Sequence, residues 1–317
     1  MLKQALGWMS PAGAKARLSV LIFHRVLPAP DVLFPDEVDA HRFDQMCGWL
    51  KSWLNIVPLD EAVIRLKAGT LPERAACITF DDGYADNHDV ALPILQRHGL
   101  KSTFFVATGF LDGGRMWNDT VIESVRLTPL PVLQLDSLLG PEFAAMSVDT
   151  VAKKRAVIQG IIGALKYRSL EDRTVLADQI ARVARVHLPT SLMMTSGQVR
   201  ALRRAGMQIG AHTVTHPILA KLDRVAARAE IANSKRELEN LLDERVGLFA
   251  YPNGKPGVDY NAESVAVVRE LGFDGAVSTR WAASTLGTDV YQIPRFTPWD
   301  KGRVRFAFRF ARNLFQS

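Results

Sequence analysis

The chain has 317 residues, of which 48% are hydrophobic and 23% charged, and its formal net charge is +6. This composition is typical of a globular protein, and the length allows one barrel-sized domain or two smaller ones. The modest, scattered basic excess fits attraction to an anionic substrate or membrane better than nucleic-acid binding, for which no motif is present, so we expect no nucleic-acid partner. Two cysteines exclude a disulfide framework. No run approaches the roughly 20 apolar residues of a membrane span. No signal peptide is recognisable, so we expect a cytoplasmic chain.

Short apolar runs alternate with helix-period segments along most of the chain. The runs have the length of buried strands and are bounded by glycine, proline or charged residues; they cover residues 18–23, 76–80, 103–107, 207–211, 248–251 and 275–278. Helical patterns cover residues 43–54, 60–67, 90–98, 223–242 and 262–271. Strands that alternate with helices indicate parallel βαβ units, so we predict an α/β fold.

Two segments depart from this alternation. Residues 112–195 carry helix-period patterns with few strand signals, so we expect a helical insertion within a single domain that spans residues 1–317. The tail at residues 301–317 is basic and amphipathic, with Phe306 and Phe310 at helical spacing among arginines. It is either a terminal helix packed on the domain or a helix on an anionic membrane surface, which would make the chain peripheral at the inner membrane.

Polar residues stand at the ends of four predicted strands, namely His24, the pair Asp81 and Asp82, His212, and Tyr251. In a parallel barrel the carboxyl ends of the strands share one face, where catalytic residues gather. An open doubly wound sheet would cluster such residues only near its switch point. Four contributing strands therefore favour the barrel.

The first motif with chemical meaning is Thr-Phe-Asp-Asp-Gly-Tyr at residues 79–84. Two adjacent carboxylates after a strand point in different directions, so one can bind a metal while the other serves as a base. Gly83 permits a turn with positive φ. The alternative is that one of these aspartates caps the N-terminus of the following helix.

The second motif is the pair His212 and His216, which are four residues apart and can converge on one metal. The preceding strand and the following Pro217 favour a strand-end loop over a helix. With one carboxylate, the two imidazoles make the ligand set of a hydrolytic zinc site with open positions for water and substrate. The same set serves non-haem iron oxygenases, but their triad usually sits on an all-β scaffold. A hydrolase also needs a base near the water, and Asp81 is placed to be one.

Together the two motifs resemble those of the polysaccharide deacetylase family, which shares the NodB homology domain and belongs with the family 4 carbohydrate esterases. The resemblance covers most of residues 18–300 apart from the insertion, and it implies a distorted (β/α) barrel. It also implies that Asp81 is the general base and that the metal ligands are Asp82, His212 and His216. The implied cofactor is a divalent ion, with zinc first and cobalt or nickel as alternatives.

The third family motif, normally Arg-x-Pro-Tyr, is altered here to Phe-Ala-Tyr-Pro-Asn-Gly at residues 249–254. Tyr251 and Asn253 are candidate substrate-binding residues, and Tyr251 is a candidate donor of a backbone N–H to an oxyanion. The arginine of the motif is missing. Arg295 is a candidate replacement that contacts substrate or orients Asp81, and a structural arginine is the alternative.

The family's late Leu-x-His motif is also absent, since no histidine follows His216. One branch of the family takes its catalytic acid from the first strand, and the run that ends in His24 resembles that branch. His24 is therefore the candidate acid, with a buried structural histidine as the alternative.

The resemblance implies a metal-dependent hydrolase that removes an N-acyl group, with acetyl first, from an amino sugar. The substrate partner would be an N-acetylated glycan, either a polysaccharide or a lipid-linked intermediate. The alternatives are a deformylase or an O-deacetylase on the same scaffold, or a non-catalytic glycan-binding relative. Inactive relatives usually lose motif residues, whereas every implied metal ligand and the base are present here.

Overall fold

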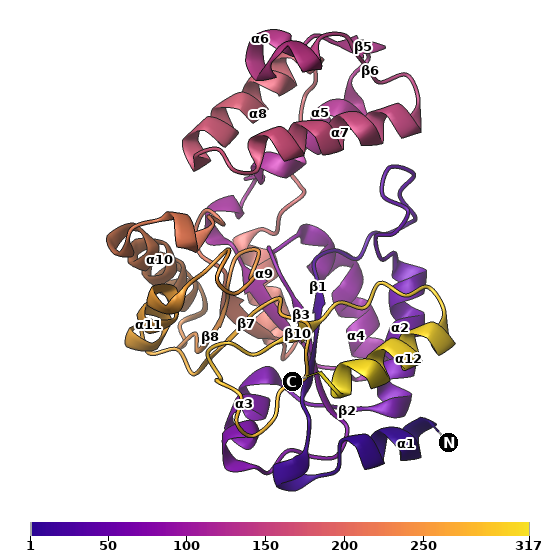
Figure 1. The fold of residues 1–317 in the computed structure, drawn as a ribbon, viewed down its shortest axis with the longest axis vertical. Helices are drawn as coiled ribbons and strands as arrows, with labels where there is room; N and C mark the ends of the chain where they lie inside the picture. Colours follow the sequence, from indigo (N-terminus) through magenta and orange to yellow (C-terminus); the bar gives the residue numbers. More distant parts are fainter. Residues whose placement is uncertain (1, 317) are drawn as a thin grey trace. The chain divides into compact units, whose positions relative to one another are not determined.

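The computed structural model describes residues 2–316, and its main feature is one sheet of parallel strands (Figure 1). The strands follow the order β10-β1-β3-β4-β7-β8-β9, and β2 pairs with β3. Their bounds are β1 Ser19–Phe23, β2 Asn55–Ile56, β3 Ala75–Phe80, β4 Thr103–Val106, β7 Gln208–Ala211, β8 Leu248–Ala250, β9 Gly275–Val277 and β10 Arg295–Phe296. The two-residue strands β2 and β10 are the ones that no apolar run predicted.

This sheet nearly closes on itself. All pairings between its neighbouring strands are parallel. A further bridge joins Val277 in β9 to Ile293, just before β10, and the N–H of Ser278 donates to the Ile293 carbonyl at 2.8 Å. The edges of the sheet are thereby brought together, and the expected distorted (β/α) barrel is confirmed.

The barrel strands are apolar on both faces because helices cover the outside and side chains fill the inside. All residues of β1 and β3 are buried, which is why both read as continuous apolar runs and not as an alternating pattern. Phe80 stacks on Phe23 and Phe104, with ring centroids 5.3 and 4.8 Å away. Cys47 and Cys77 are buried free thiols.

Helices accompany the strands: α1 Leu2–Met9, α2 Ala40–Trp53, α3 Leu59–Ala68, α4 Leu92–His98, α9 Ser196–Arg204, α10 Arg224–Leu242, α11 Ala262–Glu270 and α12 Arg303–Leu314. Figure 1 shows α10 and α11 on one side of the strands and α2 and α4 on the other. Asp39 and Asp223 cap the starts of α2 and α10, where each side chain accepts the N–H three residues on, at 2.9 and 2.8 Å. Short helices complete this part: η1 Gly13–Lys15, the π-helix η2 Asn87–Ala91, η3 Thr108–Phe110 and η5 Leu219–Lys221.

The chain divides into two compact units. The first, described above, contains residues 2–29, 36–112 and 194–316, and the second contains residues 30–35 and 113–193. The second unit is mostly helical and comprises α5 Trp117–Leu127, α6 Asp136–Leu139, η4 Pro141–Phe143, α7 Val151–Leu165 and α8 Leu170–Ala184, with a small antiparallel pair, β5 Val132–Leu133 and β6 Met146–Ser147.

This second unit has an apolar core of its own, in which Val121, Ile161 and Ile180 are fully buried. It also takes in residues 30–35, which no sequence pattern indicated. That segment is held by the ion pair between Asp31 and Arg126, at 2.6 Å. Among the described residues, no helix of either unit has the length and apolar content needed to cross a bilayer.

Candidate metal centre at the strand ends

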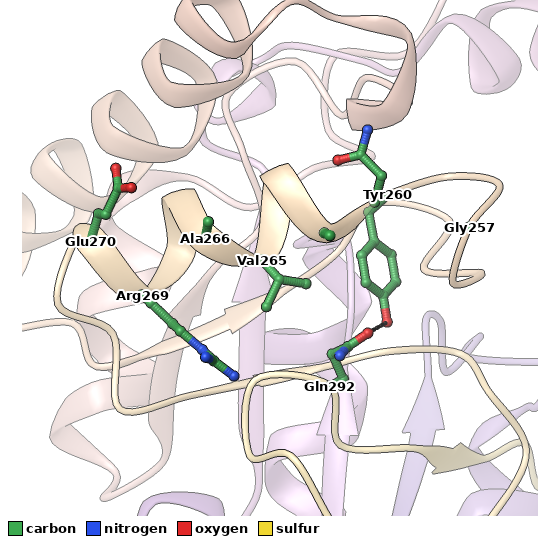
Figure 2. Close-up of a pocket in the computed structure, with 9 residues that line it drawn as sticks. Gly257, Tyr260, Val265, Ala266, Arg269, Glu270 and Gln292 are labelled. Carbon is green, nitrogen blue, oxygen red and sulfur yellow. Dashed lines mark hydrogen bonds between the residues drawn. The ribbon is translucent and has the colours of Figure 1, made fainter.

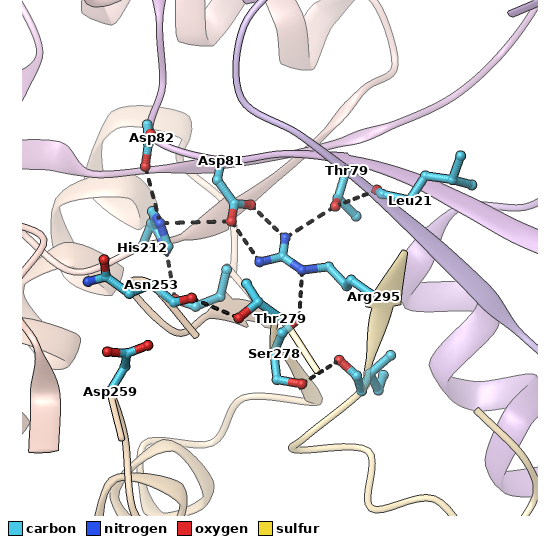
Figure 3. Close-up of polar contacts among 12 residues, drawn as sticks. Leu21, Thr79, Asp81, Asp82, His212, Asn253, Asp259, Ser278, Thr279 and Arg295 are labelled. Carbon is cyan, nitrogen blue, oxygen red and sulfur yellow. Dashed lines mark hydrogen bonds and ion pairs between the residues drawn. The ribbon is translucent and has the colours of Figure 1, made fainter. Parts of the chain in front are cut away.

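Three of the polar residues predicted at the strand ends, Asp81, Asp82 and His212, meet at the carboxyl ends of the barrel strands (Figure 3). Asp81 and Asp82 directly follow β3, and His212 directly follows β7. Neither aspartate caps a helix: the next helix, η2, has Asp86 at its N-cap and no side-chain cap. The capping alternative for this motif is therefore wrong.

Three side chains form a cluster with the donor set of a metal site. Asp82, His212 and His216 each offer one ligand atom, and these atoms lie within 4.8 Å of one another. Oδ1 of Asp82 is 3.4 Å from Nε2 of His212 and 3.5 Å from Nε2 of His216. Among the described residues this buried oxygen has no hydrogen-bond partner. A cation between the carboxylate and the two imidazoles would satisfy it, so the residues present fit a divalent metal.

The imidazoles of His212 and His216 differ in their hydrogen bonds and in the direction of their pKa shifts. Nδ1 of His212 donates to the Ala250 carbonyl at 2.8 Å, which leaves Nε2 facing Asp82 as the ligand atom. Burial alone would lower the pKa of His212, but Asp82 and Asp81 raise it above its usual value. Burial lowers the pKa of His216 to about 4, so this ring is neutral at pH 7. Because a metal ligand must be a neutral imidazole, protons would compete with a cation more strongly at His212 than at His216.

The backbone around the ligands is strained. Asp82, Thr213 and His216 have φ values of 76°, 64° and 54°, in the left-handed region that side chains rarely adopt. Each such residue typically costs about 1–3 kcal/mol. The Thr213 hydroxyl supports the turn, because it donates to the His212 carbonyl and accepts the N–H of His216.

Glu230, in α10, holds the same loop from outside. One of its carboxylate oxygens accepts the N–H groups of Val214 and Thr215, each at 2.9 Å, and the other accepts the Thr215 hydroxyl at 2.8 Å. The carboxylate thereby fixes the backbone between the two histidines. Sequence reasoning missed Glu230, because it lies in an ordinary charged helix and its distance along the chain from the loop carries no signal.

Asp81 is held by a buried guanidinium. Arg295, in β10, donates to both carboxylate oxygens of Asp81 at 2.7 Å, to the Thr79 hydroxyl at 3.2 Å and, through Nε, to the Ser278 carbonyl at 2.9 Å (Figure 3). Burial alone would raise the pKa of Asp81, but the charges of Arg295 and His212 outweigh it and hold the pKa below its usual value. Asp81 is therefore a fixed, ionised carboxylate beside the cluster.

Two residues assigned to substrate contact need correction. Arg295 is 1% exposed, and its guanidinium donates to both carboxylate oxygens of Asp81. It therefore positions that carboxylate and does not reach substrate. Tyr251 is fully buried: its hydroxyl donates to the Tyr291 carbonyl and its N–H to the Val277 carbonyl. Neither group of Tyr251 is free for a substrate, because the strand turns this residue into the core.

Asn253 and His24 lie on the solvent side of the strand ends. Asn253 is exposed, has a φ of 57°, and its carbonyl accepts the Thr279 hydroxyl at 2.8 Å. His24 is also exposed, which excludes the buried structural histidine. His24 and Asp81 follow Phe23 and Phe80, which pair with each other in neighbouring strands. A positive charge on His24 lowers the pKa of Asp81 and Asp82, less than the main causes of their shifts do.

Two further residues that sequence reasoning missed hold the segment of His24. The Asn87 side chain donates to the His24 carbonyl at 2.8 Å. Asp86 accepts the N–H of Val26 at 3.1 Å and Nε of Arg25 at 2.8 Å. Both come shortly after the Asp-Asp-Gly motif, so one segment of chain carries the carboxylates and fixes the backbone of His24.

A surface hollow of about 610 Å³ lies over α11, away from these residues (Figure 2). Tyr260 and Gln292 in its wall hydrogen-bond to each other at 3.3 Å. Arg269 is paired with Asp289, and Glu270 is paired with arginines of α10. Since its charged groups already have partners and no predicted site residue lines it, this hollow is not the candidate site.

A parallel barrel with an Asp-His-His cluster and a neighbouring carboxylate at its strand ends has the side chains that a hydrolytic metal centre would use. The family profile of polysaccharide deacetylases matches residues 68–126 and 174–276, about half of the chain. The chain therefore belongs to the polysaccharide deacetylase family, as the sequence motifs indicated.

Individual relatives agree with this membership. YxkH of Bacillus subtilis (strain 168), which carries the name of the same family, is 20% identical over 283 residues, 88% of this chain and 71% of the relative. A poly-beta-1,6-N-acetyl-D-glucosamine N-deacetylase of Staphylococcus aureus is 30% identical over 91 residues, which are 28% of this chain and 31% of that relative.

Solved structures show the same fold. The deacetylase PplD of Streptococcus pyogenes, in complex with acetate, matches with a TM-score of 0.61 and 18% identity, over 89% of this chain and 92% of that one. IcaB from Ammonifex degensii matches with a TM-score of 0.60 and 18% identity, over 96% and 98%.

The buried pair of Arg295 and Asp81 generates a prediction about stability. Arg295→Met leaves a buried carboxylate unpaired, so we expect the free energy of unfolding to fall by about 3–5 kcal/mol. The double variant with Asp81→Leu should recover much of this loss, because both charges are then gone. Urea denaturation of both variants and the wild type measures the difference; an unchanged unfolding midpoint in Arg295→Met would contradict the pairing.

The loop contact of Glu230 generates a second prediction. Glu230→Ala should weaken Zn²⁺ binding by roughly 10–100-fold, the usual cost of losing an outer support of a metal site. Glu230→Gln should retain most of the affinity, because its amide oxygen can accept both N–H groups and its NH₂ can donate to Thr215. Competition with a fluorescent chelator gives the affinities, and Glu237→Ala, an exposed residue of the same helix, is the matched control. Equal Zn²⁺ affinity in the Glu230→Ala and Glu237→Ala variants would remove Glu230 from the site.

Proposed function

We propose that the chain hydrolyses the N-acyl group, acetyl first, of an amino sugar in a polysaccharide or lipid-linked glycan. The observation that carries the proposal is the orphaned Asp82 oxygen between two imidazoles, next to a carboxylate fixed by Arg295. Family membership and the N-deacetylase name of the Staphylococcus aureus relative support the same chemistry.

Asp82, His212 and His216 would hold a divalent metal, with zinc as the first candidate. When bound, such an ion polarises the acyl oxygen and makes a water more acidic. The protein's own contribution is to keep the three ligand atoms together before the ion arrives, through the Ala250 carbonyl, the Thr213 hydroxyl and Glu230.

Asp81 would act as the general base. Arg295 holds both of its oxygens and keeps it ionised, so it can accept a proton from the attacking water without first losing one. The adjacent Asp82 faces the imidazoles instead, and this division of roles between neighbouring carboxylates follows from the positive φ of Asp82, which turns its side chain away.

His24 would act as the general acid. An amide is cleaved only if its nitrogen leaves as a neutral amine, so a donor must protonate it. His24 is exposed near the carboxylates, where a substrate could meet it, and Asn87 fixes its backbone. We propose that the N–H of Asn253, and not that of Tyr251, donates to the oxyanion. Within residues 2–316 the Asn253 N–H has no acceptor.

The same residues could in principle act on a formamide or an acetyl ester. An amide depends on a general acid more than an ester does, because its nitrogen must be protonated in order to leave. The side chains that hold the segment of His24 therefore favour N-deacylation. Product analysis by mass spectrometry on N-acetyl, N-formyl and O-acetyl glycans separates the three, and binding without turnover of any of them would indicate the non-catalytic alternative. The cytoplasmic location expected from the sequence stays a prediction.

The first test of this function compares the two neighbouring aspartates. Asp82→Asn should weaken Zn²⁺ binding by more than the roughly 10–100-fold cost of an outer-support loss, because a ligand itself is changed. Asp81→Asn should keep the metal and lose turnover by about a hundred- to ten-thousand-fold. Elemental analysis and acetate release measure both effects, with circular dichroism as the control for folding. Retention of metal and activity by both variants would refute the site.

The second test concerns His24. His24→Ala should keep its metal and slow hydrolysis of an N-acetyl amino sugar by about a hundred- to ten-thousand-fold. The loss should be much smaller on an activated aryl acetate, whose leaving group needs no proton. His41→Ala, an exposed histidine of α2, is the matched control. Equal losses on amide and ester, together with reduced metal content, would show that His24 is structural.

A further inference from the structure

The C-terminal helix α12 has an apolar face that packs against the barrel. Phe306 and Phe310 are buried, and their rings lie 5.9 and 5.7 Å from that of Phe296 in β10. Phe306 also contacts Trp53 of α2, with ring centroids 6.0 Å apart. This packing agrees with the first alternative given for the tail, a terminal helix packed on the domain.

The opposite face of α12 is also apolar, but it is exposed. Val304, Phe308 and Phe315 are 84%, 69% and 67% exposed. Spacings of four and seven residues bring these side chains onto one stripe, at about 100° per residue. Phe306 and Phe310 point the other way, and within residues 2–316 no side chain buries the stripe. Apolar groups of this size on one line are unusual on a surface that meets only water.

The neighbouring helix α1 adds a further exposed aromatic residue. Trp8 is 89% exposed, more than any other large hydrophobic residue among those described. The helix that carries it packs against α12 and is anchored by Leu6, which is buried. The exposed indole therefore stands on a helix that packs against α12. Tryptophan is favoured at the boundary between lipid and water, because its ring is apolar and its N–H can stay hydrated.

Basic side chains surround the stripe. Residues 300–316 contain five basic residues and one acidic residue; the exposed basic ones are Lys301, Arg303, Arg305 and Arg312. The one acid, Asp300, is buried and paired with Arg309 at 2.6 Å. Arg305 also reaches Asp300 at 3.3 Å but remains 82% exposed. Lys301 pairs with Asp36 at 2.8 Å, whereas Arg303 and Arg312 have no acidic partner within residues 2–316. The surface therefore combines exposed apolar side chains with a net positive charge.

We propose that Val304, Phe308 and Phe315, together with Trp8 and the basic residues around them, dock the chain on an anionic lipid bilayer. The apolar side chains would enter the boundary between headgroups and acyl chains, and each Lys or Arg near an anionic surface adds about 1 kcal/mol. The stripe extends over roughly 17 Å of one helix, which is too little for the roughly 800 Å² per partner of a stable protein interface. A bilayer needs no matching shape.

The test is co-sedimentation of the full chain with vesicles of phosphatidylcholine alone or mixed equally with phosphatidylglycerol, at low and high salt. We expect binding to the anionic vesicles that falls as salt rises. Val304→Ser combined with Phe308→Ser should weaken binding about tenfold or more, because two apolar side chains no longer enter the lipid. Ile64→Ser, on α3, is the control, since Ile64 is also 67% exposed and lies outside the proposed surface.

A second double variant tests the role of the positive charge around the stripe. Arg303→Gln with Arg305→Gln should weaken binding to anionic vesicles and flatten its salt dependence. Circular dichroism and turnover of a soluble substrate should stay unchanged in all these variants, so a failure of docking is separate from a failure of the proposed hydrolysis. Unaltered binding of the serine variant, or preference for neutral vesicles, would overturn the proposal. So would a wild-type dimer in sedimentation velocity that the serine variant dissociates, because a second copy would then cover the stripe.

Discussion

The buried ion pair between Arg295 and Asp81 is the interaction on which the candidate site and the closure of the barrel both depend. Burying two charges costs several kcal/mol for each ion unless every donor finds an acceptor. Each of the three guanidinium nitrogens of Arg295 donates to at least one of these acceptors: Asp81, the Thr79 hydroxyl and the Ser278 carbonyl. These groups belong to β3 and to the end of β9, so the guanidinium ties β10 to both. A change in the way the barrel closes would therefore also move the carboxylate assigned as the base.

This pair also explains how two adjacent aspartates reach different states. Asp81 has both oxygens on one guanidinium and stays ionised for that reason. Asp82 has a positive φ, so its side chain leaves the strand direction and faces His212 and His216. Burial alone would raise the pKa of Asp82, but the two imidazoles lower it below its usual value. The resulting oxygen is charged, buried and without a hydrogen-bond partner among the described residues, which is the condition that favours a cation.

The sequence predicted those parts of this arrangement that depend on local pattern. All barrel strands except the short β2 and β10 were predicted, because strands covered on both faces are apolar throughout. Asp81, Asp82 and His212 were found because they follow those strands. Arg295 was noticed only because the arginine of the third family motif is missing from residues 249–254. The direction of Tyr251 could not be inferred, since a shift of one residue turns a strand side chain to the other face. Glu230 and the segment at residues 30–35 were missed for another reason: both act through contacts between parts of the chain that are distant in sequence.

The difference in exposure between the proposed acid, His24, and the proposed base, Asp81, limits how a substrate can approach. Asp81 is 2% exposed and His212 1%, whereas His24 and Asn253 are open to solvent. Under the proposed function the acyl carbon must come close to the buried carboxylate while the nitrogen faces His24. The sugar attached to that nitrogen then lies on the solvent side, where a long glycan can extend without entering the barrel. The site would accept one acyl group at a time from a polymer, and the size of that group would be limited by the buried side of the cluster and not by the length of the glycan.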